Sequence, residues 1–272
     1  IAKAAHTRKI PVLYYIAPQV WAWKKGRARR LAEVSRGLAV ILPFEVEVFE
    51  CFGADVRFVG HPLLEEPVGR LDRREFCARH GLDAERLILA LFPGSRRQEL
   101  DRHLQTFLAA AARVRAALDG PQVVLARAQG LSDAELRAED VDAVVDDSRL
   151  LLRHARAAIV KSGTSTLEAA IEGTPFVTVY KTSAVTYALA RRLVKLDNIS
   201  LVNLVAGKRV VPELIQDAAT PERIAMEILP LWERSGPERQ EMIAQLGSVR
   251  AALGDAGAAD RVAAWAAEIL ER

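Results

Sequence analysis

Short runs of consecutive apolar residues alternate along this 272-residue chain with stretches in which apolar residues recur every three or four positions. The continuous runs predict buried strands, and they fall at residues 10–17, 38–44, 56–62, 87–92, 121–128, 157–163 and 175–181. The periodic stretches predict helices, and they fall at residues 26–37, 46–53, 100–118, 151–155 and 166–173. Strands that alternate with helices in this way favour an α/β fold with parallel sheets.

A polar, turn-rich segment at residues 63–82 separates two such alternations, with a domain boundary near residues 64–72. It predicts two Rossmann-like lobes, one over residues 1–66 and a second over residues 67–235. From Thr182 onward the pattern is mostly helical, and residues 236–272 form C-terminal helices, for which packing back on the first lobe is one arrangement. We expect the first lobe to be incomplete, because the chain opens at Ile1 on a pattern typical of the middle of a helix.

Charge, cysteine content and the absence of several motifs limit the classes of function that this protein can have. The net charge is only +3, but the basic residues are clustered rather than spread. Cys51 and Cys77 lack metal-binding spacing and indicate a reducing compartment without disulfides. No apolar run reaches the ~18–20 residues of a membrane span, and no signal-peptide pattern is present. Without a GxGxxG, a P-loop or a metal-ligand motif, we expect no nicotinamide or ATP cofactor and no metal.

Two strand-to-helix turns of the second lobe, in LFPGSRRQEL and VKSGTSTLEA, suit anions. In open α/β sheets, ligands bind outside the carboxyl ends of the strands, where both turns are expected. In the first, Gly94 allows close backbone approach, Ser95 can cap the helix, and Arg96 offers a fork of donors that matches phosphate oxygens. The alternative is a capped surface turn with a solvated arginine.

The second turn presents N–H and hydroxyl donors from Ser162, Gly163, Thr164 and Thr166. One turn later, Glu168 can accept hydrogen bonds from a vicinal diol such as a ribose. The alternative is plain capping, in which the hydroxyls satisfy the first N–H groups and the glutamate complements the helix dipole. Two turns of this kind on one sheet favour a nucleoside diphosphate.

Aromatic and basic residues cluster in YYIAPQVWAWKKGRARR. Two tryptophans precede five basic residues there, and YALARRLVKL repeats the theme: Trp21, Trp23, Lys24, Lys25, Arg27, Arg29 and Arg30, then Arg191 and Arg192. Rings beside cations suit a membrane interface. Nucleic-acid binding, or a core tryptophan pair beside a solvated helix face, are the alternatives.

Two single residues are candidates for catalysis. His61, in VGHPL, either faces a cleft between the lobes or is a structural turn residue. Asn203, in SLVNLVAG, is predicted to be a loop amide that caps a turn or contacts a ligand. No HExxH, DxD-like pair or GxSxG nucleophile elbow accompanies them.

Six blocks in order resemble the lipid-A-disaccharide synthase family: PVLYYIAPQVWAWKKGRARRL, VILPFEVEVFE, VRFVGHPL, LFPGSRRQEL, KSGTSTLEAAIEGTPFVTVYK and RRLVKLDNISLVNLVAGKRVVPELIQ. The similarity runs to about residue 230. It implies a GT-B glycosyltransferase without a bound metal. Such an enzyme transfers 2,3-diacylglucosamine from UDP to 2,3-diacylglucosamine 1-phosphate with inversion, giving a β-1,6 disaccharide phosphate and UDP.

The resemblance also implies partners and site residues. It places the protein on the cytoplasmic side of the inner membrane, with the Trp21–Arg30 stretch against the lipid surface and no nucleic-acid partner. Arg96 of PGSR, and the SGTSTLE turn with Glu168, hold the UDP of the donor, and Asn203 lies near the active site. The oligomeric state is left open.

This sequence departs from the family pattern in three ways. Ala17 replaces the serine of SPQVWAW, and Val202 replaces the proline of LPN beside Asn203. The Gly-rich start of the family, and the acidic residue favoured there as general base, do not occur, so we expect the base in a segment preceding Ile1 and the chain to be a fragment. Another GT-B or epimerase-type enzyme on a different UDP-sugar, and a non-catalytic module that binds anionic membrane, are the alternative functions.

Overall fold

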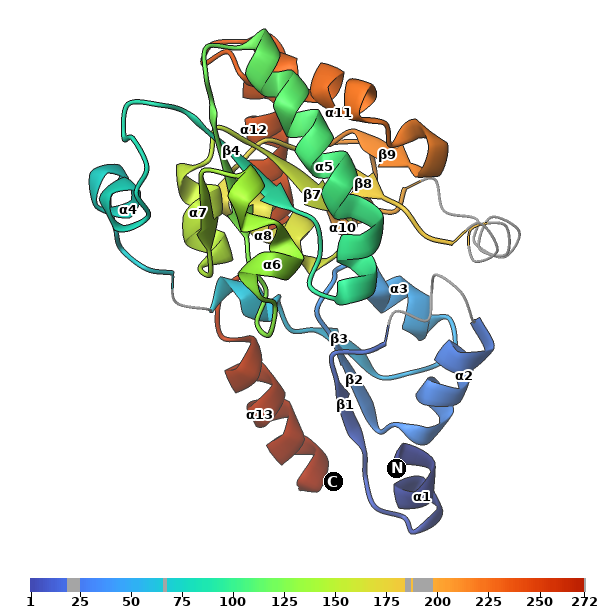
Figure 1. Cartoon of the computed structure of the whole chain (residues 1–272). Helices are drawn as coiled ribbons and strands as arrows, with labels where there is room; N and C mark the ends of the chain where they lie inside the picture. Colours follow the sequence, from blue (N-terminus) through green and yellow to red (C-terminus); the bar gives the residue numbers. More distant parts are fainter. Residues whose placement is uncertain (19–24, 66–67, 184–186, 188–197, 272) are drawn as a thin grey trace. The chain divides into compact units, whose positions relative to one another are not determined.

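The computed structural model describes residues 1–18, 25–65, 68–183, 187 and 198–271 (Figure 1). The chain divides into two compact units, and each is described by itself. Unit 1 comprises Ile1–Glu66, Ala184–Asp197 and Ala251–Arg272, and unit 2 comprises Pro67–Ser183 and Asn198–Arg250. Within the described ranges, no helix has both the length and the apolar character needed to cross a membrane.

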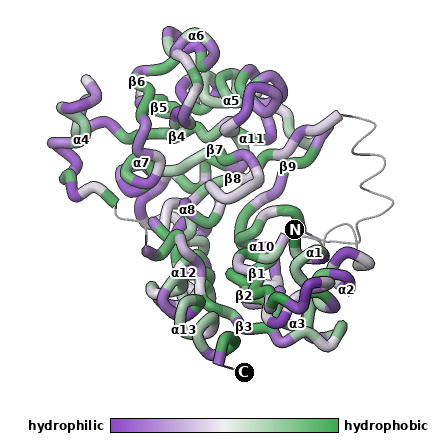
Figure 2. Tube along the Cα trace, turned by 90° about the horizontal axis from the view of Figure 1, so that it is seen from below, coloured by the Kyte–Doolittle hydropathy of each residue, from purple (hydrophilic) through white to green (hydrophobic). Residues whose placement is uncertain are grey.

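Unit 1 is built on a three-stranded parallel sheet in the order β1 (Leu13–Tyr15), β2 (Gly37–Val40) and β3 (Val56–Phe58). A short helix, α1 (Ala2–Thr7), precedes it. The connecting helices α2 (Lys25–Val34) and α3 (Glu45–Glu50) cover one face, where Ala28, Leu38, Val40 and Phe49 are buried together. The exposed side of α2 is strongly hydrophilic (Figure 2), so only a narrow stripe of this helix contributes to the core.

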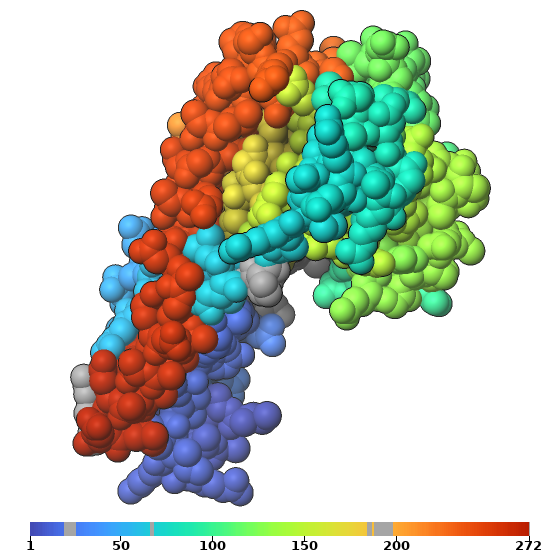
Figure 3. Space-filling view, turned by 90° about the vertical axis from the view of Figure 1, so that its left-hand side faces the viewer, coloured from blue at the N-terminus to red at the C-terminus, as the bar shows by residue number. Residues whose placement is uncertain are grey.

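The C-terminal helix α13 (Ala258–Leu270) covers the other face of this sheet. Its Trp265 is 1% exposed and packs in a cluster with Ala39, Val59 and Ile269. Because successive strand residues point to opposite faces, β2 directs Leu38 and Val40 to one cluster and Ala39 to the other. Figure 3 shows the red C-terminal segment against the blue N-terminal residues.

Unit 2 contains a six-stranded parallel sheet in the order β6-β5-β4-β7-β8-β9. Its strands are β4 (Ile88–Phe92), β5 (Gln122–Ala126), β6 (Ala143–Val145), β7 (Ala157–Lys161), β8 (Phe176–Tyr180) and β9 (Glu213–Ile215). The chain adds strands outward from β4 in one direction and from β7 in the other. The neighbours β4 and β7 therefore flank the topological switch point, where open α/β sheets bind ligands.

Helices cover both faces of this sheet (Figure 1). On one face, α5 (Arg97–Ala117) contacts α11 (Pro221–Ile228). On the other, α8 (Thr164–Glu172) contacts α7 (Ser148–His154) and α10 (Leu201–Ala206). The remaining described helices are α4 (Arg73–Arg79), α6 (Asp133–Leu136), α12 (Pro237–Ala252) and four short 3₁₀ turns at Pro62–Leu64, Ala138–Asp140, Gln216–Ala218 and Leu229–Leu231.

The predicted α/β fold with parallel sheets is confirmed, and several element boundaries are corrected. Gly37 begins β2, whereas the prediction ended a helix there. α4 lies inside the segment predicted to be turn-rich, because Asp72 and Glu75 form a capping box that starts a helix there. The prediction also missed α6, β6, α10 and β9, the last of which interrupts the region predicted to be mostly helical.

Candidate functional site

Two turns lie side by side at the carboxyl edge of the unit 2 sheet: the first turn (residues 93–96) after β4 and the second turn (residues 162–164) after β7. The pairing of Phe92 with Val160 brings the ends of the two strands together. Helix α5 begins after Arg96 and α8 after Gly163, and neither of these N-cap residues makes a side-chain cap. The side-chain caps that the plain capping interpretation requires are therefore absent at both helix starts, which favours the anion-binding interpretation.

The first turn is held by Glu99, a residue that sequence reasoning did not single out. The Ser95 N–H donates to Glu99 Oε2 over 2.9 Å. Gly94 has φ +133°, and a Cβ there would lie 2.5 Å from the Glu99 Cβ, so only glycine fits. The expectation that Ser95 caps the helix is wrong, because Arg96 occupies the N-cap position. The Arg96 side chain is 82% exposed, with Nη1 3.8 Å from Glu99 Oε1.

Glu99 also connects the two turns. Lys161, the last residue of β7, donates from Nζ to Glu99 Oε1 over 2.9 Å. Burial by itself raises the pKa of Glu99, but the hydrogen bonds from Lys161 and Ser95 and the nearby cations outweigh it, so the pKa is lowered. The carboxylate is therefore charged at neutral pH and fixed between the turns.

The second turn and the start of α8 contain the four predicted donor residues Ser162, Gly163, Thr164 and Thr166. The Ser162 hydroxyl donates to Ile199 O over 3.1 Å, and the Thr166 hydroxyl donates to Gly163 O over 2.7 Å. Thr166 is fully buried, whereas Thr164 is exposed. The structure thus leaves Thr164 exposed and uses the hydroxyls of Ser162 and Thr166 internally.

Glu168 lies one turn into α8 and is partly exposed. Its Oε2 accepts a hydrogen bond of 3.3 Å from the Ser148 hydroxyl at the start of α7. The carboxylate is thereby oriented on the same edge of the sheet as the second turn. Its predicted contact with a ribose stays a prediction.

Asn203 lies in α10, so its predicted position in a loop is wrong. It is fully buried, and its Oδ1 accepts from the N–H groups of Val210 and Val211 over 2.7 and 2.9 Å. Its Nδ2 donates to Val211 O over 3.0 Å and to Glu213 Oε1 over 2.7 Å. The amide therefore organises the chain between α10 and β9, and its contact with a ligand stays a prediction.

His61, in unit 1, is 5% exposed and is the N-cap of the 3₁₀ turn Pro62–Leu64. Its ring Nδ1 accepts a hydrogen bond of 3.2 Å from the Leu63 N–H, and its backbone N–H donates to Leu253 O over 3.0 Å. Burial lowers the pKa of His61 to about 4. A ring that is neutral at pH 7 and accepts from the backbone matches the structural interpretation of this residue.

The lowered pKa of His61 predicts a loss of stability in acid. Between its usual 6.5 and its folded value of about 4, a proton binds only the unfolded chain, so falling pH favours unfolding. We expect wild type to lose about 1–2 kcal/mol more than His61→Asn between pH 7 and pH 5, since asparagine keeps an acceptor for Leu63 without titrating. Urea unfolding of both proteins at the two pH values measures this, and equal losses would contradict it.

The predicted membrane or acceptor residues fall largely outside the described residues. Trp21, Trp23, Lys24, Arg191 and Arg192 are among those outside, and of Lys25 only the backbone is described, at the start of α2. Arg27 is exposed on α2, as are Arg29 and Arg30, and Arg29 pairs with Glu33 one turn later. The described part of the cluster is thus a solvated basic helix face.

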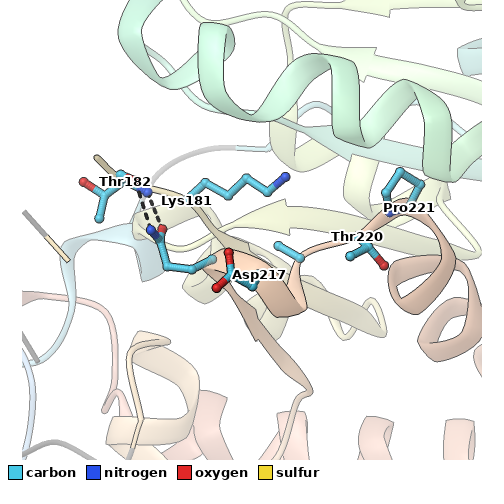
Figure 4. Close-up of a pocket in the computed structure, with 7 residues that line it drawn as sticks. Lys181, Thr182, Asp217, Thr220 and Pro221 are labelled. Atoms are coloured by element: carbon cyan, nitrogen blue, oxygen red, sulfur yellow. Dashed lines mark hydrogen bonds between the residues drawn. The ribbon is translucent and has the colours of Figure 1, made fainter. Parts of the chain in front are cut away.

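A cavity of about 380 Å³ opens at the ends of β8 and β9, where no sequence prediction fell (Figure 4). In Figure 4 the Lys181 side chain extends toward α5, where its Nζ donates to the Thr106 hydroxyl over 2.9 Å. His103, buried in α5, links the cavity to the first turn: its Nδ1 lies 2.7 Å from Glu99 O, and its Nε2 accepts from the Lys181 N–H. The cavity is lined by Lys181, Thr182, Gln216, Asp217, Ala219, Thr220 and Pro221.

The paired turns gather hydrogen-bond donors and positive charge at one edge of the sheet. It combines two helix N-termini without side-chain caps, an exposed guanidinium on Arg96 and the ammonium of Lys161. In the part of the chain that the structure describes, no three His, Cys, Asp or Glu residues are grouped so that they could hold a metal ion.

Comparison with solved structures shows the same fold in an epimerase and in a glycosyltransferase. A putative UDP-N-acetylglucosamine 2-epimerase from Listeria monocytogenes matches with a TM-score of 0.64 and 15% identity, over 99% of this chain and 71% of that one. The calicheamicin glycosyltransferase CalG4 matches with a TM-score of 0.58 and 18% identity, over 98% and 70%. These likenesses confirm the GT-B type of fold.

Sequence comparison is more specific. The family model for lipid-A-disaccharide synthetase matches residues 1–256. Lipid-A-disaccharide synthases from Geobacter metallireducens and Syntrophus aciditrophicus are 41% and 42% identical to this chain, over 99% and 100% of it and 72% and 73% of their own lengths. The enzyme of that name from Anaeromyxobacter sp. (strain K) is 44% identical over 96% of the chain and 70% of its own length. The chain therefore belongs to the lipid-A-disaccharide synthase family of glycosyltransferases, which act in lipid A synthesis.

Proposed function

We propose that this chain transfers 2,3-diacylglucosamine from UDP to 2,3-diacylglucosamine 1-phosphate with inversion at the anomeric carbon. The products are the β-1,6-linked disaccharide 1-phosphate and UDP. The observation that carries the proposal is the pair of adjacent turns in unit 2, whose helices start without side-chain caps beside an exposed Arg96. The sequence identity to lipid-A-disaccharide synthases supports this donor and acceptor over other UDP-sugars.

The paired turns suit both binding and departure of UDP. As the glycosidic bond breaks, negative charge builds on the leaving phosphoryl oxygen, and fixed N–H groups and cations stabilise that charge without reorganising. Arg96 takes one phosphoryl group through its fork of donors. The second turn contributes the N–H groups at the start of α8, and Glu168 accepts from the ribose hydroxyls.

We propose that the acceptor and the inner-membrane surface meet the protein through the basic residues of α2 and the segment before it. Arg27, Arg29 and Arg30 support this, because they are exposed on one helix while Ala28 between them is buried. Cations on the outer face of an amphipathic helix attract anionic lipid. The protein then works as a peripheral enzyme on the cytoplasmic side of that membrane.

The donor site is tested by replacing Arg96 with alanine. Charge-assisted hydrogen bonds to phosphate contribute about 1.5–3 kcal/mol, so UDP should bind roughly 10- to 100-fold more weakly. Titration calorimetry of the whole chain with UDP measures the dissociation constant. The matched control is Arg102→Ala, an exposed arginine further along α5, which should bind UDP as wild type does.

Two results would overturn the proposal. One is wild-type protein that takes up no UDP at millimolar concentration. The other concerns the sugar: the gene product, including any sequence that precedes Ile1, should release UDP from UDP-2,3-diacylglucosamine when acceptor is present. Efficient turnover of UDP-N-acetylglucosamine, which lacks the acyl chains, would instead assign the chain to another UDP-sugar reaction.

A further inference from the structure

The ion pair between Lys161 and Glu99 joins the two turns of the proposed donor site. Lys161 is the last residue of β7. Glu99 is the third residue of helix α5 and lies 62 positions earlier in the chain. Their side chains are 18% and 16% exposed, so the contact is shielded from water on most sides. Shielding from water strengthens an ion pair. The exposed remainder of the two side chains keeps the pair accessible to a ligand.

The carboxylate of Glu99 is fixed from several directions. Besides Lys161, its oxygens face the Ser95 N–H at 2.9 Å and Arg96 Nη1 at 3.8 Å, and its Cβ packs against Gly94. A group held in this way is an anchor for the flexible lysine side chain. The lysine therefore loses little further freedom when it meets a ligand.

The ammonium of Lys161 lies over the start of helix α8. A Cβ built on Gly163 would be 3.5 Å from Lys161 Nζ, and Gly163 is the N-cap of that helix. The ammonium uses one of its donors on Glu99 and has three in all. It is thus placed between the two helix N-termini, with donors left for an oxygen bound at either one.

The charges at the paired turns do not cancel. Arg96 and Lys161 supply two positive charges and Glu99 one negative charge, so the three together carry one positive charge. Both helix N-termini add partial positive charge. A diphosphate brings two phosphoryl groups, and the planar fork of Arg96 matches the oxygens of one of them, which leaves the second group for another cation.

We infer that Lys161, anchored by Glu99, binds the second phosphoryl group of the donor and makes the site selective for a nucleoside diphosphate over a monophosphate. The inference rests on the proposed function and adds to it a residue and a selectivity. Lys161 acts as a compact charge between the turns, whereas Arg96 acts through planar hydrogen bonding. Removing Lys161 should therefore affect UDP much more than UMP.

Titration calorimetry of the whole chain with UDP and with UMP tests this. In Lys161→Met, UDP should bind about tenfold or more weakly, whereas UMP should change by less than about threefold. Lys161→Arg restores a cation and should recover most of the preference for UDP. The control is Lys181→Met: this lysine follows the neighbouring strand β8, is also partly buried, and directs its ammonium to Thr106 on α5.

The outcomes separate the inference from the proposed function. If wild type binds no UDP, the proposed function fails. If wild type binds UDP and Lys161→Met weakens UDP and UMP by the same factor, Lys161 only supports the turn and the inference fails. Should the methionine variant not fold, Lys161→Gln retains a hydrogen-bond donor for Glu99 without the charge, and an unchanged ratio of UDP to UMP affinity in that variant is equally decisive.

Discussion

Replacing Asn203 with alanine should lower the free energy of unfolding of unit 2 by roughly 3–5 kcal/mol, because each buried backbone or carboxylate group left without its partner costs about 1–3 kcal/mol. Asn203 is fully buried, and its amide makes four hydrogen bonds, to Val210, Val211 and Glu213. Alanine removes all four at once.

The effect should extend to the second turn through a chain of contacts. Asn203 holds Glu213, whose carboxylate accepts from the N–H groups of Ile199 and Ser200 over 2.9 Å each. The carbonyl of Ile199 in turn accepts from the Ser162 hydroxyl in the second turn. Asn203 is thus a positioning residue for the proposed donor site, which gives a structural reason for its place beside the active site in the family resemblance.

Urea unfolding, followed by amide hydrogen exchange at β9, measures the loss. The matched control is Gln240→Ala, which removes an exposed amide bonded to Arg234 O and should cost about 0.5 kcal/mol or less. We expect UDP affinity to fall together with stability. A variant that keeps wild-type stability and yet loses UDP binding would show instead that the asparagine contacts the ligand directly.

The sequence predicts the central strands of unit 2 well for a physical reason. β4, β5, β7 and β8 are each five residues long and almost wholly buried, so each is encoded as a continuous apolar run. The glycine and serine residues that follow β4 and β7 are also easy to recognise in the sequence, because a turn that exposes backbone N–H groups needs small residues. The arginine after β4 is recognised by its charge beside that turn.

The elements that were missed are short or carry a polar residue for a local purpose. β6 and β9 have three residues each, too few for a period to show. β9 begins with Glu213, which serves the connection before α10 rather than the sheet. The pairing of Lys161 with Glu99 could not be predicted either, since it depends on which strands become neighbours.

Replacing Trp265 with alanine should cost about 3–5 kcal/mol in unit 1, the range for removing a buried aromatic side chain. Trp265 is 1% exposed and fills the face of the three-stranded sheet that α2 and α3 do not cover. The fit is close: a Cβ on Gly37 would lie 2.6 Å from the Trp265 ring. The guanidinium of Arg57 lies 4.4 Å from the ring centroid, which adds a cation–π contact.

Circular dichroism melting and hydrogen exchange at β2 measure this loss. Leu270→Ala is the matched control, because Leu270 lies on the same helix but is 77% exposed, and it should change stability by less than about 0.5 kcal/mol. If Trp265→Ala costs no more than Leu270→Ala, helix α13 does not stabilise this sheet.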